Sequence, residues 1–116
     1  MSNYDIDVIP EIYDKYDRSG IYAIKVDNKI LYVGQSKNMR KRIKQHISCI
    51  IAENPQERKY QILHNAYANN ISITFDVLEY TTGKESLKKA EESWIYIMTP
   101  PLNTVYLSED IDTRLS

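Results

Sequence analysis

The chain has 116 residues, room for one compact domain, and its hydrophobic share of 42% and charged share of 27% are ordinary for a globular protein. No apolar run approaches the roughly 18 residues that cross a membrane, and residues 1–5 lack the basic-then-apolar order of a signal peptide. A lone cysteine, Cys49, excludes an internal disulfide. These absences predict a cytoplasmic protein with no membrane partner.

The net charge of −1 and the pI near 6.1 give no overall attraction to phosphate. The charges are unevenly distributed, however, because positions 37–46 hold five basic residues and no acidic ones, whereas acids gather in 5–17 and 109–112. We therefore expect one cationic helix and acidic ends. The five basic residues are Lys37, Arg40, Lys41, Arg42 and Lys44.

A short helix is predicted within 1–17, with Pro10 in its first turn. The two strands of a hairpin follow, 20–26 and 29–34, which are rich in aromatic and β-branched residues. Asp27-Asn28 suits the tight turn between them. A symmetric turn there sets Tyr22 and Tyr32 at or near opposed positions. If each tyrosine stands an even number of residues from the turn, both rings lie on one face of the hairpin.

Two helices are predicted next. Asn38 is a suitable N-cap for a helix that runs to about residue 52, and Pro55 separates it from a second helix over 56–69. At 100° per residue, Arg42 and His46 lie together along one edge of the first helix's apolar stripe. The predicted stripes are Met39, Ile43, Ile47, Ile50 and Ile51 on the first helix and Tyr60, Leu63, Ala66 and Tyr67 on the second.

A third strand and a last helix complete the series. Alternation of Ile71, Ile73, Phe75 and Val77 indicates a strand with one buried face, and a helix over 84–98 ends before Pro100-Pro101. The apolar face of this helix is Leu87, Ala90, Trp94, Ile95 and Met98. Glu91 lies within that face, where an unpaired carboxylate costs several kcal/mol. It is therefore the anomalous residue of this helix.

The candidates for chemistry, taken from the residues alone, each have an ordinary structural explanation. Tyrosines of a hairpin usually rim a core, and an arginine on a helix edge is usually solvated. A single histidine beside an apolar stripe is more often packed than a ligand. Glu91 could pair with Arg42 or with a lysine. The candidates are Tyr22, Tyr32, Arg42, His46 and Glu91.

The order of these residues resembles the GIY-YIG nuclease family. The first family motif is matched by 20–22 (GIY) and the second by 32–34 (YVG), with nine residues between Tyr22 and Tyr32. Arg42 stands at the place of the family arginine, and His46 matches a histidine found in many members. The family's glutamate helix is similar to 91–95 (EESWI), followed by 100–103 (PPLN).

The resemblance implies an α+β fold, a small three-stranded antiparallel sheet flanked by helices in the order ββααβα. It implies a divalent-metal-dependent endonuclease that acts on DNA, with Mg²⁺ or Mn²⁺ held by Glu91 as the only protein ligand. Tyr32 and Tyr22 would position or activate water, and Arg42 would stabilise phosphate charge. His46 would assist or orient Arg42, and Asn103 would support the site or touch the phosphate. Lys37, Arg40, Lys41 and Lys44 would guide the DNA backbone.

Two other functions remain open at this stage. One is a protein of the same fold that binds nucleic acid without cleaving it or depends on a partner. The other is an adaptor whose tyrosine-rich surface binds a protein.

The domain is expected over 18–106, with an extension packed on the core at 1–17 and an acidic tail at 107–116. Such short additions are too small to read a long DNA site, so we expect loose cutting, recognition of a DNA structure, a homodimer or a separate targeting subunit.

Overall fold

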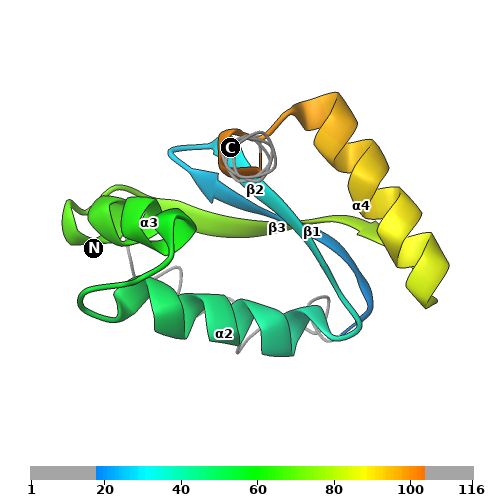
Figure 1. Cartoon of the computed structure of the whole chain (residues 1–116), viewed down its shortest axis with the longest axis horizontal. Coiled ribbons are helices and arrows are strands. Elements are labelled where there is room, and N and C mark those ends of the chain that lie inside the picture. Colours follow the sequence, from blue (N-terminus) through cyan, green and yellow to red (C-terminus); the bar gives the residue numbers. More distant parts are fainter. Residues whose placement is uncertain (1–17, 104–116) are drawn as a thin grey trace, which may run out of the picture.

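The structure, a computed structural model, describes residues 18–103, and the expectations for 1–17 and for the tail lie outside these residues. Six elements follow one another in the predicted order ββααβα (Figure 1). They are β1 (Gly20–Val26), β2 (Lys29–Ser36), α2 (Met39–Ile51), α3 (Arg58–Ala68), β3 (Ile73–Tyr80) and α4 (Lys84–Met98). The predicted α+β class with one three-stranded antiparallel sheet is confirmed, and its strand order is β2-β1-β3.

The β1–β2 hairpin has an irregularity that decides which side chains share a face. Asp27 and Asn28 have φ of 52° and 65°, as a tight two-residue hairpin turn requires. Lys25 pairs with Ile30, but Ile24 pairs with Tyr32, so one extra residue bulges out of β2. A regular ladder would pair Tyr22 with residue 33, and alternation would then send Tyr32 to the opposite face.

The bulge therefore turns Tyr32 to the same face as Tyr22. The two tyrosines are diagonal neighbours rather than opposed, since Tyr22 pairs with Gly34 and Tyr32 with Ile24. They therefore lie near opposed positions, as the sequence predicted, although a symmetric turn does not reveal the bulge. The expectation of one shared face is confirmed by ring centroids 6.5 Å apart.

The two faces of the sheet are covered by different helices (Figure 1). On one face, Tyr22 and Ile24 belong to a buried cluster with the apolar stripes of α2 and α3. On the other, Ile21 and Val33 pack with Leu87 of α4. This division follows from strand alternation, because successive side chains point to opposite faces.

Three predicted core residues are exposed. Ile51 is 41% exposed at the last turn of α2, Ile71 is 40% exposed before β3 begins, and Met98 is 38% exposed at the end of α4. All three lie at or beyond the end of a helix or strand. There the hydrophobic periodicity of the sequence continues, but among the described residues no neighbouring element covers the side chain. Within residues 18–103 no helix combines the length and apolarity needed to cross a membrane.

Candidate active site

Tyr22 and Tyr32 form the base of the candidate site on the face covered by α2 and α3. Tyr22 is only 1% exposed, whereas Tyr32 is partly buried. Burial raises the pKa of Tyr22, and Tyr32 raises it further, while the charge of Arg42 and a hydrogen bond from it lower it. The Tyr22 hydroxyl is therefore protonated at neutral pH.

Both tripeptides need their glycine for steric reasons. A Cβ on Gly34 would lie 2.5 Å from Tyr22 Oη and 2.6 Å from its Cζ, so the tyrosine ring passes directly over this backbone. A Cβ on Gly20 would lie 2.3 Å from the main-chain oxygen of Glu79 on β3. Both positions require close approach, which only glycine permits without displacement.

Helix α2 carries Arg42 to the tyrosines. Its N-cap is Asn38, as predicted, whose Oδ1 accepts a hydrogen bond from the Lys41 main-chain N–H at 3.0 Å. Arg42 follows in the first turn, with Nη1 donating to Gln45 Oε1 at 3.1 Å. Its guanidinium is near enough to Tyr22 to act on that hydroxyl by charge and by a hydrogen bond.

His46 lies one turn further along α2 and is fully buried, rather than at the edge of the stripe. Its Nε2 is 2.5 Å from Tyr22 Oη and its Nδ1 is 2.6 Å from Tyr60 Oη. Burial, together with the charges of Arg42 and Lys59, lowers the pKa of His46 to about 3. The imidazole is therefore neutral at pH 7 and bonded to a phenol on each side.

Lys59 and Tyr60 of α3 are residues that sequence reasoning missed as parts of the site. Lys59 Nζ lies 4.5 Å from the ring centroid of Tyr32 and 4.8 Å from that of Tyr60. Burial lowers the pKa of this ammonium group, the charge of Arg42 lowers it further, and that of Glu57 opposes the shift. Tyr60 was expected only in the core. Nothing in the sequence reveals how α3 is rotated against α2, so no pattern marks these contacts.

Glu91 lies on α4, against the other face of the sheet, and is half-buried as predicted. Its Oε1 accepts a hydrogen bond from Gln35 Nε2 at 3.1 Å. Burial raises the pKa of Glu91, the neighbouring Glu92 raises it further, and the Gln35 amide lowers it. Within residues 18–103 it forms no salt bridge, so pairing with Arg42 or a lysine is not found there.

The surroundings of Glu91 fit a divalent cation. A half-buried carboxylate held by one neutral amide gains from a positive charge. The described part of the chain gathers no cluster of three or more His, Cys, Asp or Glu side chains. An ion held here would therefore keep most of its ligands as waters, as Mg²⁺ commonly does.

Asn103 closes the open edge of β2. Its Oδ1 accepts from the main-chain N–H of Val33 at 2.8 Å, and its Nδ2 donates to the main-chain oxygen of the same residue at 3.0 Å. The side-chain amide thus imitates one step of a neighbouring strand, where an edge would otherwise be unpaired. This geometry shows Asn103 supporting β2, and the second N–H of its amide remains for another partner.

The candidate residues thus fall into two groups on either side of β2. One group lies on the face of α2 and α3 and consists of Tyr22, Tyr32, Arg42 and His46. The other approaches from α4 and the segment that follows it, and consists of Glu91 and Asn103. Four consecutive β2 residues join the groups. Tyr32 lies beside the His46 ring, Val33 binds Asn103, Gly34 lies under Tyr22, and Gln35 binds Glu91.

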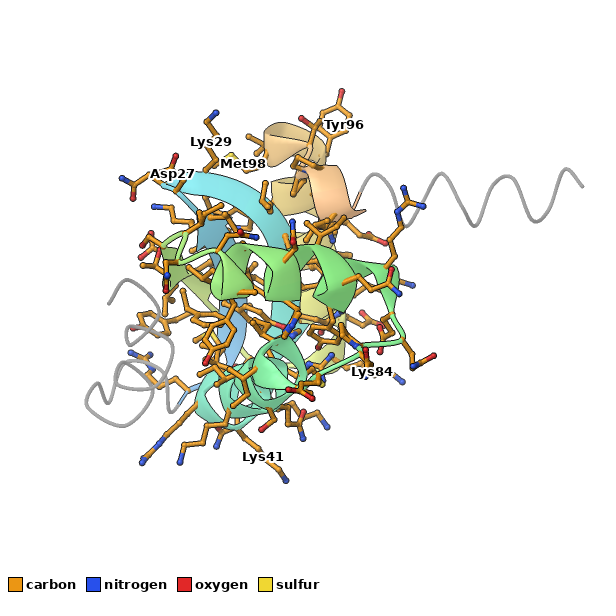
Figure 2. All side chains as sticks on the ribbon, turned by 90° about the vertical axis from the view of Figure 1, so that its left-hand side faces the viewer. Asp27, Lys29, Lys41, Lys84, Tyr96 and Met98 are labelled. Carbon is orange, nitrogen blue, oxygen red and sulfur yellow. The ribbon has the colours of Figure 1, made fainter. Side chains whose placement is uncertain are left out.

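The expected DNA-guiding residues lie near the N-terminal end of α2. Lys37, Lys41 and Lys44 are exposed, and Arg40 is partly buried. Figure 2 shows Lys41 pointing away from the body of the molecule, at the opposite end from Tyr96 and Met98 of α4. Arg40 and Lys44 have interactions within the chain. Lys37 and Lys41 are therefore the better candidates for contact with a ligand.

Comparison with family models gives a match over residues 18–103 to the GIY-YIG catalytic domain. This chain belongs to the GIY-YIG nuclease family. The matched range contains both tripeptides, Arg42, Glu91 and Asn103. The family assignment identifies the chain as an endonuclease. A search of curated proteins finds no match.

Two solved structures share the GIY-YIG fold. One is a mutant of bacteriophage T4 EndoII, with a TM-score of 0.58 and 22% identity, covering 72% of each chain. The other is the N-terminal endonuclease domain of UvrC from Thermotoga maritima, a point mutant bound to its catalytic divalent cation. Its TM-score is 0.55 and its identity 16%, over 88% of this chain and 97% of that one. At such identities the likeness establishes the fold.

Proposed function

We propose that this domain hydrolyses DNA phosphodiester bonds with one divalent cation, Mg²⁺ or Mn²⁺, held by Glu91. The observation that carries the proposal is the half-buried Glu91 carboxylate, linked through Gln35 to the strand that bears Tyr32. The UvrC domain, which has the same fold and is bound to its catalytic divalent cation, supports the metal requirement. When bound, the cation would supply positive charge to the scissile phosphate and to the departing 3′-oxygen.

The residues on the tyrosine face act on the attacking water and the phosphate. Arg42 offers a planar fork of N–H donors to the charge that develops on the phosphate oxygens. Tyr32, the more exposed of the two tyrosines, positions or deprotonates the water, and the Lys59 ammonium lies 4.5 Å from its ring centroid. Tyr22 hydrogen-bonds at the same place. His46 holds Tyr22, and Asn103 supports β2 from its edge.

The exposed lysines of the cationic helix guide the DNA backbone. Lys37 and Lys41 lie in or just before the first turn of α2, the turn that carries Arg42. Phosphates drawn to these side chains therefore come close to the guanidinium. The contact is independent of base sequence, so it adds affinity without specificity.

The test is cleavage of supercoiled plasmid with Mg²⁺ or Mn²⁺, comparing the wild type with Glu91→Ala and Arg42→Ala. We expect metal-dependent nicking or linearisation that both substitutions abolish. Glu92→Ala is the matched control, because Glu92 is the exposed neighbour of Glu91 on α4, and it should cut as the wild type does. A folded wild type that cuts neither plasmid, branched DNA nor single-stranded DNA would contradict the proposal and favour binding without cleavage.

A further inference from the structure

The hydrogen bonds around His46 extend beyond the family's motif residues to α3. Tyr60 is 5% exposed, and its hydroxyl is the partner of His46 Nδ1, while the Tyr22 hydroxyl is the partner of Nε2. Cys49 of α2 also lies within hydrogen-bonding reach of Tyr60. The three side chains Tyr22, His46 and Tyr60 thus form a buried chain that links β1, through α2, to α3.

A neutral imidazole has one N–H donor and one acceptor nitrogen, so this chain has a direction. The low pKa of His46 excludes the doubly protonated form at neutral pH. Two arrangements remain. Either Tyr22 donates to Nε2 and Nδ1–H donates to Tyr60, or Tyr60 donates to Nδ1 and Nε2–H donates to Tyr22.

Counting donors and acceptors distinguishes the two arrangements. The partners of Tyr22 among residues 18–103 are His46 and Arg42, and an arginine can only donate. If Nε2 carried the proton, the buried Tyr22 hydroxyl would have no acceptor there, which costs about 1–3 kcal/mol. If Nδ1 carries it, Tyr22 donates to Nε2, and the Tyr60 hydroxyl can donate a hydrogen bond to the sulfur of Cys49.

We propose that Tyr60 is a positioning residue of the active site, which holds His46 in the Nδ1–H tautomer and thereby fixes the direction of the Tyr22 hydroxyl proton. With its proton turned toward His46, Tyr22 faces Arg42 and the substrate with lone pairs alone. Tyr22 then accepts a hydrogen bond from the attacking water and cannot donate one to a phosphate oxygen. This assignment of Tyr22 rests on the proposed nuclease function, whereas the tautomer does not.

The first test is the tautomer of His46 in the full chain without DNA, read from two-bond ¹H–¹⁵N correlations of the imidazole rings at pH 7. His64 is an internal reference, because its Nδ1 is 2.7 Å from the main-chain oxygen of Ile50, which can only accept. We expect both histidines to show a pyrrole-like Nδ1 and a pyridine-like Nε2, with His64→Gln used to assign the signals. A pyridine-like Nδ1 in His46 would overturn the proposal.

The second test is Tyr60→Phe, with Tyr67→Phe as the matched control. Tyr67 lies two turns further along α3 and contacts the His64 ring rather than His46. In Tyr60→Phe the Nδ1–H loses its acceptor, so the Nε2–H form of His46 becomes populated. We expect kcat of DNA cleavage to fall roughly tenfold with KM unchanged, at the lower end of what orienting partners contribute. Tyr67→Phe should retain both the tautomer and kcat.

The outcomes separate this inference from the proposed function. A wild type that cleaves DNA but carries the proton on Nε2 would overturn the inference alone. A wild type with the proton on Nδ1 that cleaves no DNA would overturn the nuclease function and leave the tautomer standing. Unchanged kcat and tautomer in a folded Tyr60→Phe would show that Tyr60 only fills space. If that variant fails to fold, the tautomer of the wild type still decides.

Discussion

The two faces of the sheet hold their functional side chains in different ways. On the face of α2 and α3, Tyr22 and His46 are buried and joined to each other and to Tyr60 by hydrogen bonds of 2.5 and 2.6 Å. On the face of α4, the packing is apolar, and among residues 18–103 Glu91 has one hydrogen bond, from the Gln35 amide. The first face therefore fixes orientation, and the second leaves carboxylate oxygens available to a cation.

In the proposed mechanism, the two faces have different tasks along one strand. Aromatic groups that orient water and phosphate would need rigid neighbours, and burial supplies these. A metal ligand instead needs free lone pairs and surroundings that hold little positive charge. Strand β2 carries both groups because its consecutive side chains alternate between the faces. Predictions about either face accordingly probe different properties.

The largest effect is expected for Arg42→Lys on the tyrosine face. Lysine keeps the charge but loses the planar fork of donors that binds phosphate oxygens in pairs. We expect cleavage to fall by about a hundredfold, a loss of roughly 2.7 kcal/mol of transition-state stabilisation. The measurement is single-turnover cleavage with saturating metal. Cleavage within threefold of the wild type would show that Arg42 acts only as a point charge.

Gly34→Ala should disturb the same face through packing. The new Cβ would meet Tyr22 Oη at 2.5 Å and Tyr32 Cε2 at 3.0 Å, so the Tyr22 ring must move away from His46. We expect the free energy of unfolding in urea to fall by about 1–3 kcal/mol, with cleavage reduced as well. A variant as stable and active as the wild type would mean that Tyr22 has room that the structure does not show.

Arg42 and Gly34 belong to the part of the site that the sequence could predict. The tripeptides, the N-cap at Asn38 and the apolar helix stripes are local patterns, so the order of elements and the half-buried Glu91 followed from them. The bulge in β2 depends on pairing between strands, and the Tyr60 and Lys59 contacts depend on how α3 is rotated against α2. Such tertiary choices leave no periodic signal in one sequence.

A pH effect is expected from His46, because its pKa is about 3 in the folded protein and near 6.5 when unfolded. Between these values the unfolded chain binds more protons, so the free energy of unfolding falls as pH drops from about 6.5 toward 3. The slope approaches about 1.4 kcal/mol per pH unit. Urea unfolding at pH 7, 5.5 and 4.5 should show a shallower slope in His46→Gln than in the wild type.

The control for this pH effect is His64→Gln, which removes a histidine outside the buried chain. Its slope should follow that of the wild type more closely than that of His46→Gln. Equal slopes in the wild type and in His46→Gln would contradict the neutral, buried state of His46.

The smallest effect is expected from the exposed lysines of the cationic helix. Removal of Lys37 and Lys41 together should weaken DNA binding only severalfold at physiological salt, because each contributes a screened phosphate contact. The slope of log K against log salt concentration should become less steep by up to about 2 for duplex DNA. Equal slopes in the wild type and in Lys37→Ala/Lys41→Ala would remove these lysines from the DNA path.

The proposed nuclease depends on a divalent cation that binds at Glu91 on the α4 face and does not need the tyrosine face for binding. The most direct measurement is paramagnetic broadening of main-chain amide signals as Mn²⁺ is added to the full chain. We expect the amide signals of Glu91 and Gln35 to broaden early, Glu91→Gln to remove this broadening, and Tyr22→Phe to leave it unchanged. Broadening around Glu91 that persists in Glu91→Gln, or that disappears in Tyr22→Phe, would show that the cation is not held by Glu91 on the α4 face alone.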